Sequence, residues 1–265
     1  MISKLLIVLL LLEGIFFHGC GYFSSENSFP KPVSVFGPVL HVLFIGNSYT
    51  EVNDLPSLFT QLADSGGHPV VAGNLTPGGS TLLQHSQDHV TLDRIKSQKW
   101  DEVILQDHSF MPALTKERER ELNPGVRVLA AAIRENGSQL MLYLTWGRQK
   151  GLPEQGFPDY DSMQAQLTEG YMEIAREQKI PVAPVGEAWK AALGHDKNAD
   201  LWGPDGSHPS LEGSYLAACV FYAAIFGQTP EGLRYYAGLP PGDAWAMQVA
   251  ATETVLANKS EWMLP

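Results

Sequence analysis

The sequence predicts an α/β protein built on a parallel sheet that is covered by helices on both faces. Short apolar segments alternate with longer amphipathic segments through most of the chain, and about five of the short segments have the length of strands. Their apolar residues run almost without interruption, which is typical of parallel strands buried on both faces. This order predicts strands joined by right-handed helical crossovers.

In the first half of the chain, the clearest strand is the apolar run from Val42 to Ile45, which ends in a Gly-Asn-Ser turn. A helix is expected after it, because apolar residues recur at helical spacing until Gly66-Gly67 stops the pattern. The elements expected here are a strand at 42–45, a helix at 55–65, a strand at 68–74, a helix at 82–98 and a strand at 100–107.

The second half begins with a helical pattern at 115–136, which Pro124 must kink or divide. The glycine- and proline-rich segment 146–160 is long for a connection, and such connections are usually functional or disordered. The other expected elements are a strand at 139–145, a helix at 162–178, a strand at 180–185, helical turns at 187–193, and helices at 211–226 and 243–257.

The composition is that of a globular protein, with 44% hydrophobic and 18% charged residues among 265. Residues 39–265 are long enough to form one α/β domain with a full core. The formal net charge of −11 argues against a nucleic-acid partner, because no basic field exists to collect phosphates.

The first residues indicate export. Residues 1–20 combine a short basic start with an apolar run and are expected to be a signal peptide, followed by a linker at 21–38. Gly19-Cys20 resembles the end of a bacterial lipoprotein signal, so membrane attachment through a lipidated Cys20 stands beside simple cleavage and an uncleaved anchor. Cys219 lies in an apolar helical context and is expected to be a buried thiol.

Ser48 is the first candidate for a catalytic residue. It follows the strand at 42–45, at the carboxyl end where open α/β sheets bind ligands and display functional groups. A serine at this place can act as a nucleophile if a base and an orienting acid lie nearby. Taken alone, Asn47-Ser48 is better explained as the N-cap of the next helix.

The segment Trp202–Ser210 contains the candidate base. Asp205 and His208, three residues apart in a Gly/Pro-rich turn, can meet through a carboxylate oxygen and one imidazole nitrogen, and the other nitrogen can then take a proton from a serine. The motif is weak by itself, since Asp205 can equally shape or cap the entry to the following helix. In combination with Ser48 in this chain order, it predicts a Ser-His-Asp triad.

These motifs resemble those of the SGNH hydrolase superfamily, the GDSL-like esterases and lipases. In that family, a Gly-Asp/Asn-Ser block after the first strand carries the nucleophile and a late Asp-x-x-His block carries the acid and base; Ser48, Asp205 and His208 match these positions. The resemblance extends over residues 39–226. It implies a three-layer α/β/α sandwich around a five-stranded parallel sheet, and a serine hydrolase that needs no cofactor.

The resemblance also implies donors for an oxyanion. They are the backbone N–H groups of Ser48 and of a glycine after the second strand, for which Gly79 is preferred over Gly78. The family's third donor is an asparagine side chain after the third strand, which this sequence lacks. Gln106 is preferred in its place because it keeps an amide, and His108 is the alternative.

Trp146, Arg148 and Tyr160 lie on the long connection and are expected to bind substrate, by stacking on a sugar or by binding an anionic group. A surface loop with incidental aromatic residues explains them equally well. His85 and His89 have helical spacing but lack a third ligand in the sequence, so no metal site is predicted.

The sequence therefore predicts an exported serine esterase, periplasmic or at the cell surface. Its partner would be a small-molecule or glycan ester, in the first place a short acyl ester such as an O-acetyl ester of a carbohydrate. The alternatives are a lipid-directed esterase or lysophospholipase, and a non-hydrolytic glycan-binding or acyltransferase member of the family.

Overall fold

The computed structural model describes residues 38–265. The predicted signal peptide with Cys20, and the linker up to residue 37, lie outside the described residues. Within the described residues, Cys219 is a buried free thiol.

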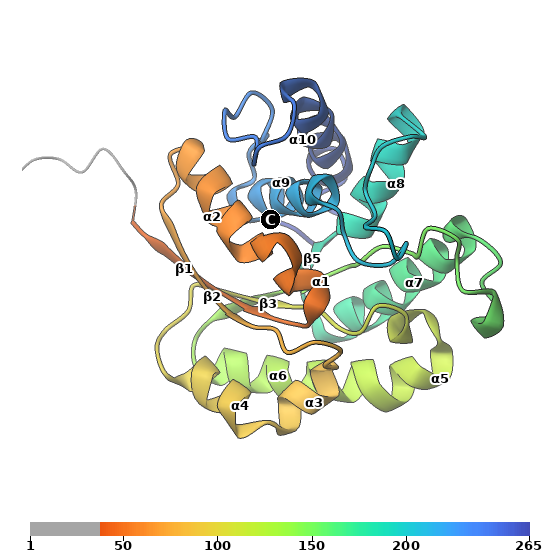
Figure 1. Cartoon of the computed structure of the whole chain (residues 1–265). Coiled ribbons are helices and arrows are strands. Elements are labelled where there is room, and N and C mark those ends of the chain that lie inside the picture. The colour runs from red at the N-terminus through yellow and green to blue at the C-terminus, as the bar shows by residue number, and fades with distance from the viewer. Residues whose placement is uncertain (1–37) are drawn as a thin grey trace, which may run out of the picture. The chain divides into compact units, whose positions relative to one another are not determined.

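The centre of the fold is a five-stranded parallel sheet in the order β2-β1-β3-β4-β5 (Figure 1). This confirms the predicted α/β class and the predicted strand order along the chain. The strands are β1 (Leu40–Ile45), β2 (Val70–Leu75), β3 (Glu102–Leu105), β4 (Gln139–Tyr143) and β5 (Val182–Ala183).

Strand β1 lies between β2 and β3, and its last four residues are buried. Its residues from Val42 to Ile45 are at most 1% exposed, which explains the uninterrupted apolar run in the sequence. Ile45 is paired with Leu75 of β2 and with Leu105 of β3. Because these parallel strands end together, the segments that follow β1, β2 and β3 meet at one edge of the sheet.

Helices cover both faces of the sheet, as predicted (Figure 1). On one face lie α2 (Leu55–Ser65), α8 (Val185–His195) and α9 (Leu211–Phe226), with α10 (Pro241–Leu256) packed against α9. On the other face lie α3 (Leu82–Gln87), α4 (His89–Lys96) and α6 (Asn123–Glu135), with α7 (Tyr160–Gln178) beside α6. The shorter elements are α1 (Ser48–Glu51), α5 (Thr115–Glu117), a π-helical segment (Arg118–Leu122) and short 3₁₀ turns at Val52–Asp54, Met111–Ala113 and Pro153–Gln155.

Two long helices of the sequence analysis are divided in the structure. The expected helix at 82–98 breaks at Asp88, whose carboxylate accepts hydrogen bonds from the N–H groups of Val90 and Thr91 and so caps α4 as a new helix. The pattern at 115–136 is interrupted by the π-helical segment Arg118–Leu122, shortly before Pro124, which lies in the first turn of α6 and has no N–H to donate.

The long connection at 146–160 is ordered by its own small core. Leu152 and Phe157 form an antiparallel bridge, and both pack in an apolar cluster with Met163 of α7. This small core fixes the path of residues 147–151, which run along the edge of the sheet where β1 and β3 end. None of the helices in residues 38–265 combines the length and the apolar composition that a membrane span requires.

Candidate active site

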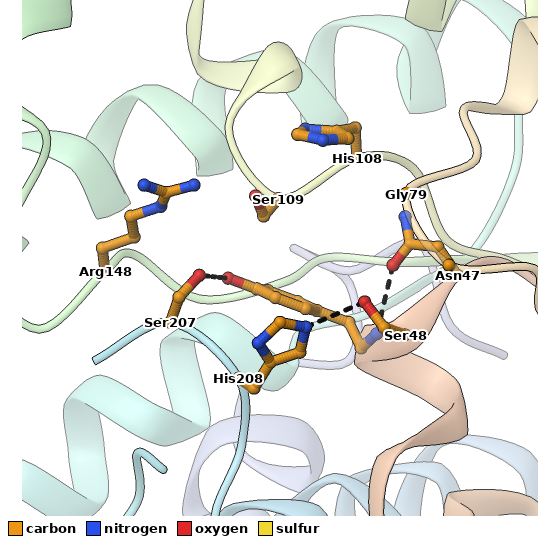
Figure 2. Close-up of a pocket in the computed structure, with 10 residues that line it drawn as sticks. Asn47, Ser48, Gly79, His108, Ser109, Arg148, Ser207 and His208 are labelled. Carbon is orange, nitrogen blue, oxygen red and sulfur yellow. Dashed lines mark hydrogen bonds between the residues drawn. The ribbon is translucent and has the colours of Figure 1, made fainter. Parts of the chain in front are cut away.

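Ser48 is the first residue of α1 and comes three positions after Ile45, the last residue of β1. The helix cap is Asn47, whose side-chain oxygen accepts a hydrogen bond from the Tyr49 N–H at 3.1 Å. The Ser48 hydroxyl is therefore not needed as a cap. Its Oγ lies 2.9 Å from Nε2 of His208, a residue 160 positions later in the chain (Figure 2).

His208 is held by Asp205 in the turn before α9. The Asp205 carboxylate lies 2.6 Å from Nδ1 of His208 and also accepts hydrogen bonds from the backbone N–H groups of Ser207 and His208. Burial opposes ionisation, but these hydrogen bonds prevail and lower the pKa of Asp205 to about 2. An ionised Asp205 accepts a hydrogen bond from Nδ1–H of His208, so Nε2 carries no proton and presents its lone pair to the Ser48 hydroxyl.

Further contacts, which the sequence analysis missed, connect the Ser48 turn to the His208 turn. The Tyr49 hydroxyl lies 2.7 Å from the Ser207 hydroxyl, and the Tyr49 ring meets the His208 ring edge-on at 5.5 Å. The Asn53 side-chain amide donates to the carbonyl oxygens of Pro209 and Ser210 and to the hydroxyl of Ser214. The nucleophile and the base are thus fixed to each other by their chain neighbours as well as by their own contact.

The structure corrects the role expected for Gln106. Its side chain is 1% exposed and does not line the cavity beside Ser48. Its Oε1 accepts from the Asn47 N–H and the Thr50 hydroxyl, both at 2.9 Å, and its Nε2 donates to Asn47 Oδ1 and to the Asp107 carbonyl. Both the oxygen and the nitrogen of the Gln106 amide thus form their hydrogen bonds within the protein. The amide braces the Ser48 turn and is not available to an oxyanion.

Gly46 allows Gln106 to come this close. A Cβ at Gly46 would lie 2.5 Å from Gln106 Oε1 and 2.9 Å from Thr50 Oγ1, so a side chain there would displace the brace. On its other side, the Gly46 carbonyl is 2.8 Å from Nε2 of buried His85, whose Nδ1 contacts the Thr91 hydroxyl. His85 therefore has a structural role at this turn.

Ser48 opens into a cavity of about 380 Å³ at the edge of the sheet (Figure 2). The cavity is lined by Asn47, Ser48, Tyr49, Gly78, Gly79, His108, Ser109, Arg148, Ser207 and His208. Gly79 has a left-handed backbone (φ 73°), and neither its N–H nor that of Ser48 has a hydrogen-bond partner within residues 38–265. Two backbone donors beside Ser48 are thus free to bind a ligand oxygen.

The residues expected to bind substrate divide into two groups. Arg148 lines the cavity, and so does His108, the alternative to Gln106. Trp146 does not: it is completely buried between the rings of Tyr49 and Trp189. Tyr160 lines a different depression of about 480 Å³, so the expectation that these two aromatic residues meet substrate beside Ser48 is wrong. Trp146 is buried because the start of the connection is folded onto the edge of the sheet.

Replacing Gln106 with leucine tests its role as a brace. The change keeps the volume but leaves the buried Asn47 N–H and Thr50 hydroxyl without their acceptor, so the free energy of unfolding should fall by about 2 kcal/mol. Urea unfolding followed by circular dichroism measures this change. Gln61→Leu, the same substitution at an exposed position of α2, should stay within about 0.5 kcal/mol of the parent. A variant at Gln106 with full stability and impaired ester hydrolysis would show instead that this amide serves the oxyanion.

Comparison with known proteins gives structural matches only. No protein-family model matches the sequence, and the search among curated proteins found no match. A DUF4886 family protein from Bacteroides uniformis is similar with a TM-score of 0.70 and 23% identity over 83% of this chain and 95% of that one. A protein from Slackia heliotrinireducens, provisionally assigned as an SGNH hydrolase, has a TM-score of 0.60 and 27% identity over 71% of this chain and 100% of its own.

An acetyl-xylooligosaccharide esterase from Geobacillus Stearmophilus is also similar, with a TM-score of 0.52 and 16% identity over 79% of this chain and 98% of that one. At this identity the likeness concerns the fold alone. The matches agree with the sheet order, the layers and the resemblance that the sequence motifs indicate. The chain has the fold of the SGNH hydrolase superfamily.

Proposed function

We propose that the protein is a serine esterase in which Ser48, His208 and Asp205 form the catalytic triad. The observation that carries the proposal is the continuous chain of contacts from Ser48 Oγ to His208 Nε2 at 2.9 Å and from His208 Nδ1 to Asp205 at 2.6 Å. This is the arrangement by which a base activates a hydroxyl and an acid fixes the tautomer of the base. Similarity in fold to SGNH hydrolases supports the same reaction class.

The reaction follows from the positions of these groups. His208 takes the Ser48 proton as Oγ attacks the ester carbonyl, and the imidazolium formed is stabilised by ionised Asp205. The backbone N–H groups of Ser48 and Gly79 donate to the oxyanion. His208 then protonates the leaving alcohol, and a water molecule activated by His208 releases the acyl group from Ser48.

The cavity favours a small ester. None of the side chains that line it is aliphatic, and its volume of about 380 Å³ is small for a long acyl chain together with an alcohol. Among the proteins of similar fold are esterases whose names refer to acetylated xylan or xylooligosaccharides. We therefore propose short acyl esters, in the first place O-acetyl esters of carbohydrates, as substrates. Export by the segment at 1–20 would expose the domain to such glycans.

Replacing Ser48 with alanine tests the proposed reaction. Hydrolysis of p-nitrophenyl acetate should fall by at least about 1,000-fold, because the covalent route is lost. The circular dichroism spectrum and melting temperature should stay close to those of the parent, since Asn47 and not Ser48 caps α1. Ser57→Ala, on the surface of α2, is the matched control. Substantial hydrolysis by folded Ser48→Ala protein would exclude Ser48 as the nucleophile.

The length of the acyl chain separates the carbohydrate esterase from the lipid-directed alternative. Because no aliphatic channel lines the cavity, kcat/KM for p-nitrophenyl acetate should exceed that for p-nitrophenyl decanoate by at least about 10-fold. Rates are compared below the critical micelle concentration, so that aggregation of the longer ester does not enter. A preference for the decanoate would favour the lipid-directed esterase.

A further inference from the structure

Arg148 is the one arginine or lysine side chain among the residues that line the cavity. It comes from the connection after β4, and Figure 2 shows it at the end of the cavity that lies away from Gly79 and Asn47. Ser109 and Ser207 border the same end. The protein has a formal net charge of −11, so a cation here creates a local field opposite to that of the whole molecule.

The guanidinium of Arg148 forms no ion pair within residues 38–265. Arg118 and Arg127 form ion pairs with glutamates of α7, whereas no carboxylate of residues 38–265 lies within ion-pair distance of Arg148. Its Nε is buried and has no hydrogen-bond partner there. Its guanidinium carbon lies 5.5 Å from the ring centroid of Phe110, which fixes its position without satisfying its donors. A buried N–H of a charged group without a partner is costly unless a ligand supplies one.

The surroundings of Arg148 suit an anion with a single charge. Burial, together with the positive charge of Arg148, lowers the pKa of His108, so this imidazole is neutral at pH 7 and adds no second charge. The Ser109 hydroxyl adds a neutral donor at the same end of the cavity. One planar guanidinium with a hydroxyl beside it matches the two oxygens of a carboxylate better than a doubly charged phosphate.

The side of the cavity indicates which part of the ester carries the anion. The leaving alcohol must lie near His208, which protonates it. Figure 2 shows His208 and Ser207 on the same side of Ser48 as Arg148, whereas Gly79 and Asn47 lie on the other side. A group bound to Arg148 therefore belongs to the alcohol part of the substrate.

We propose that Arg148 binds a carboxylate on the alcohol part of the ester, so that the substrate class is an acyl ester of an acidic sugar, such as a uronic acid residue. The inference rests on the proposed esterase function and narrows its substrate. Arg148 is then a specificity-determining residue, because it raises kcat/KM for anionic esters relative to neutral ones.

The test uses 3- and 4-acetoxybenzoate, which carry a carboxylate on the alcohol part, and their methyl esters as neutral counterparts. For each substrate pair, the ratio of kcat/KM for the anionic ester to that for the neutral ester is measured in the parent and in Arg148→Gln. The ratio should fall roughly 10- to 100-fold in the variant for at least one of the two isomers, as expected for loss of a charged hydrogen-bonded pair. Arg148→Lys keeps the positive charge but lacks the planar guanidinium that can bind both oxygens of a carboxylate. The ratio should therefore fall less in this variant than in Arg148→Gln.

Lys150→Gln is the matched control. It removes one positive charge from the same connection, but Lys150 lines a neighbouring depression and not the cavity at Ser48, so the ratio should change by less than about 2-fold. An equal loss of activity on anionic and neutral esters in Arg148→Gln would overturn the proposal and leave Arg148 as a packing residue on Phe110. Mono-p-nitrophenyl succinate carries its carboxylate on the acyl part, and p-nitrophenyl acetate serves as its neutral counterpart. A fall in the kcat/KM ratio of this pair alone would also overturn the proposal. Hydrolysis of none of these esters, nor of p-nitrophenyl acetate, by the parent would instead refute the esterase function.

Discussion

The position of Ser48 depends on the buried amide of Gln106. Both ends of this amide bind the segment from Asn47 to Thr50, so the end of β3 holds the turn that follows β1. The parallel pairing of Ile45 with Leu105 brings the two segments together, and the missing side chain of Gly46 leaves room for the contact. Because the site is buried, each of these hydrogen bonds would be expensive to lose. Strand pairing and the Gln106 amide thus fix the turn that carries Ser48, without any contribution from His208 or Asp205.

The second half of the site is built on this turn through contacts between chain neighbours. Tyr49 binds Ser207, and Asn53 reaches the first turn of α9, so the segments on either side of Ser48 and His208 are joined at two points. Rigid support of this kind holds a serine and a histidine within hydrogen-bond distance of each other. The buried Trp146 completes the support, since it stacks on Tyr49 and donates from its ring N–H to the Ser207 carbonyl.

The sequence was sufficient for the features that depend on local pattern. The apolar run of β1, the helices α2 and α9 and the Asp-x-x-His turn have short-range signals, and the structure places Ser48, Asp205 and His208 together. The role of Gln106 was mispredicted because it depends on which strand lies beside β1, which no local pattern encodes. Trp146 was mispredicted for the same reason: an aromatic residue after a strand can face solvent or fold back onto the sheet edge. The division at Asp88 had a detectable signal, an aspartate that can cap a restarted helix.

The chemistry proposed for the cavity and the specificity proposed for Arg148 both require that Ser48 be acylated. Treatment with a fluorophosphonate, followed by peptide mass spectrometry, tests this requirement most directly, because the reagent reacts with a serine that a neighbouring base activates. We expect one label per chain, located on Ser48, and strongly reduced labelling in His208→Ala. A protein that hydrolyses esters while carrying no label on Ser48, or that is labelled on Ser48 equally well without His208, would contradict it.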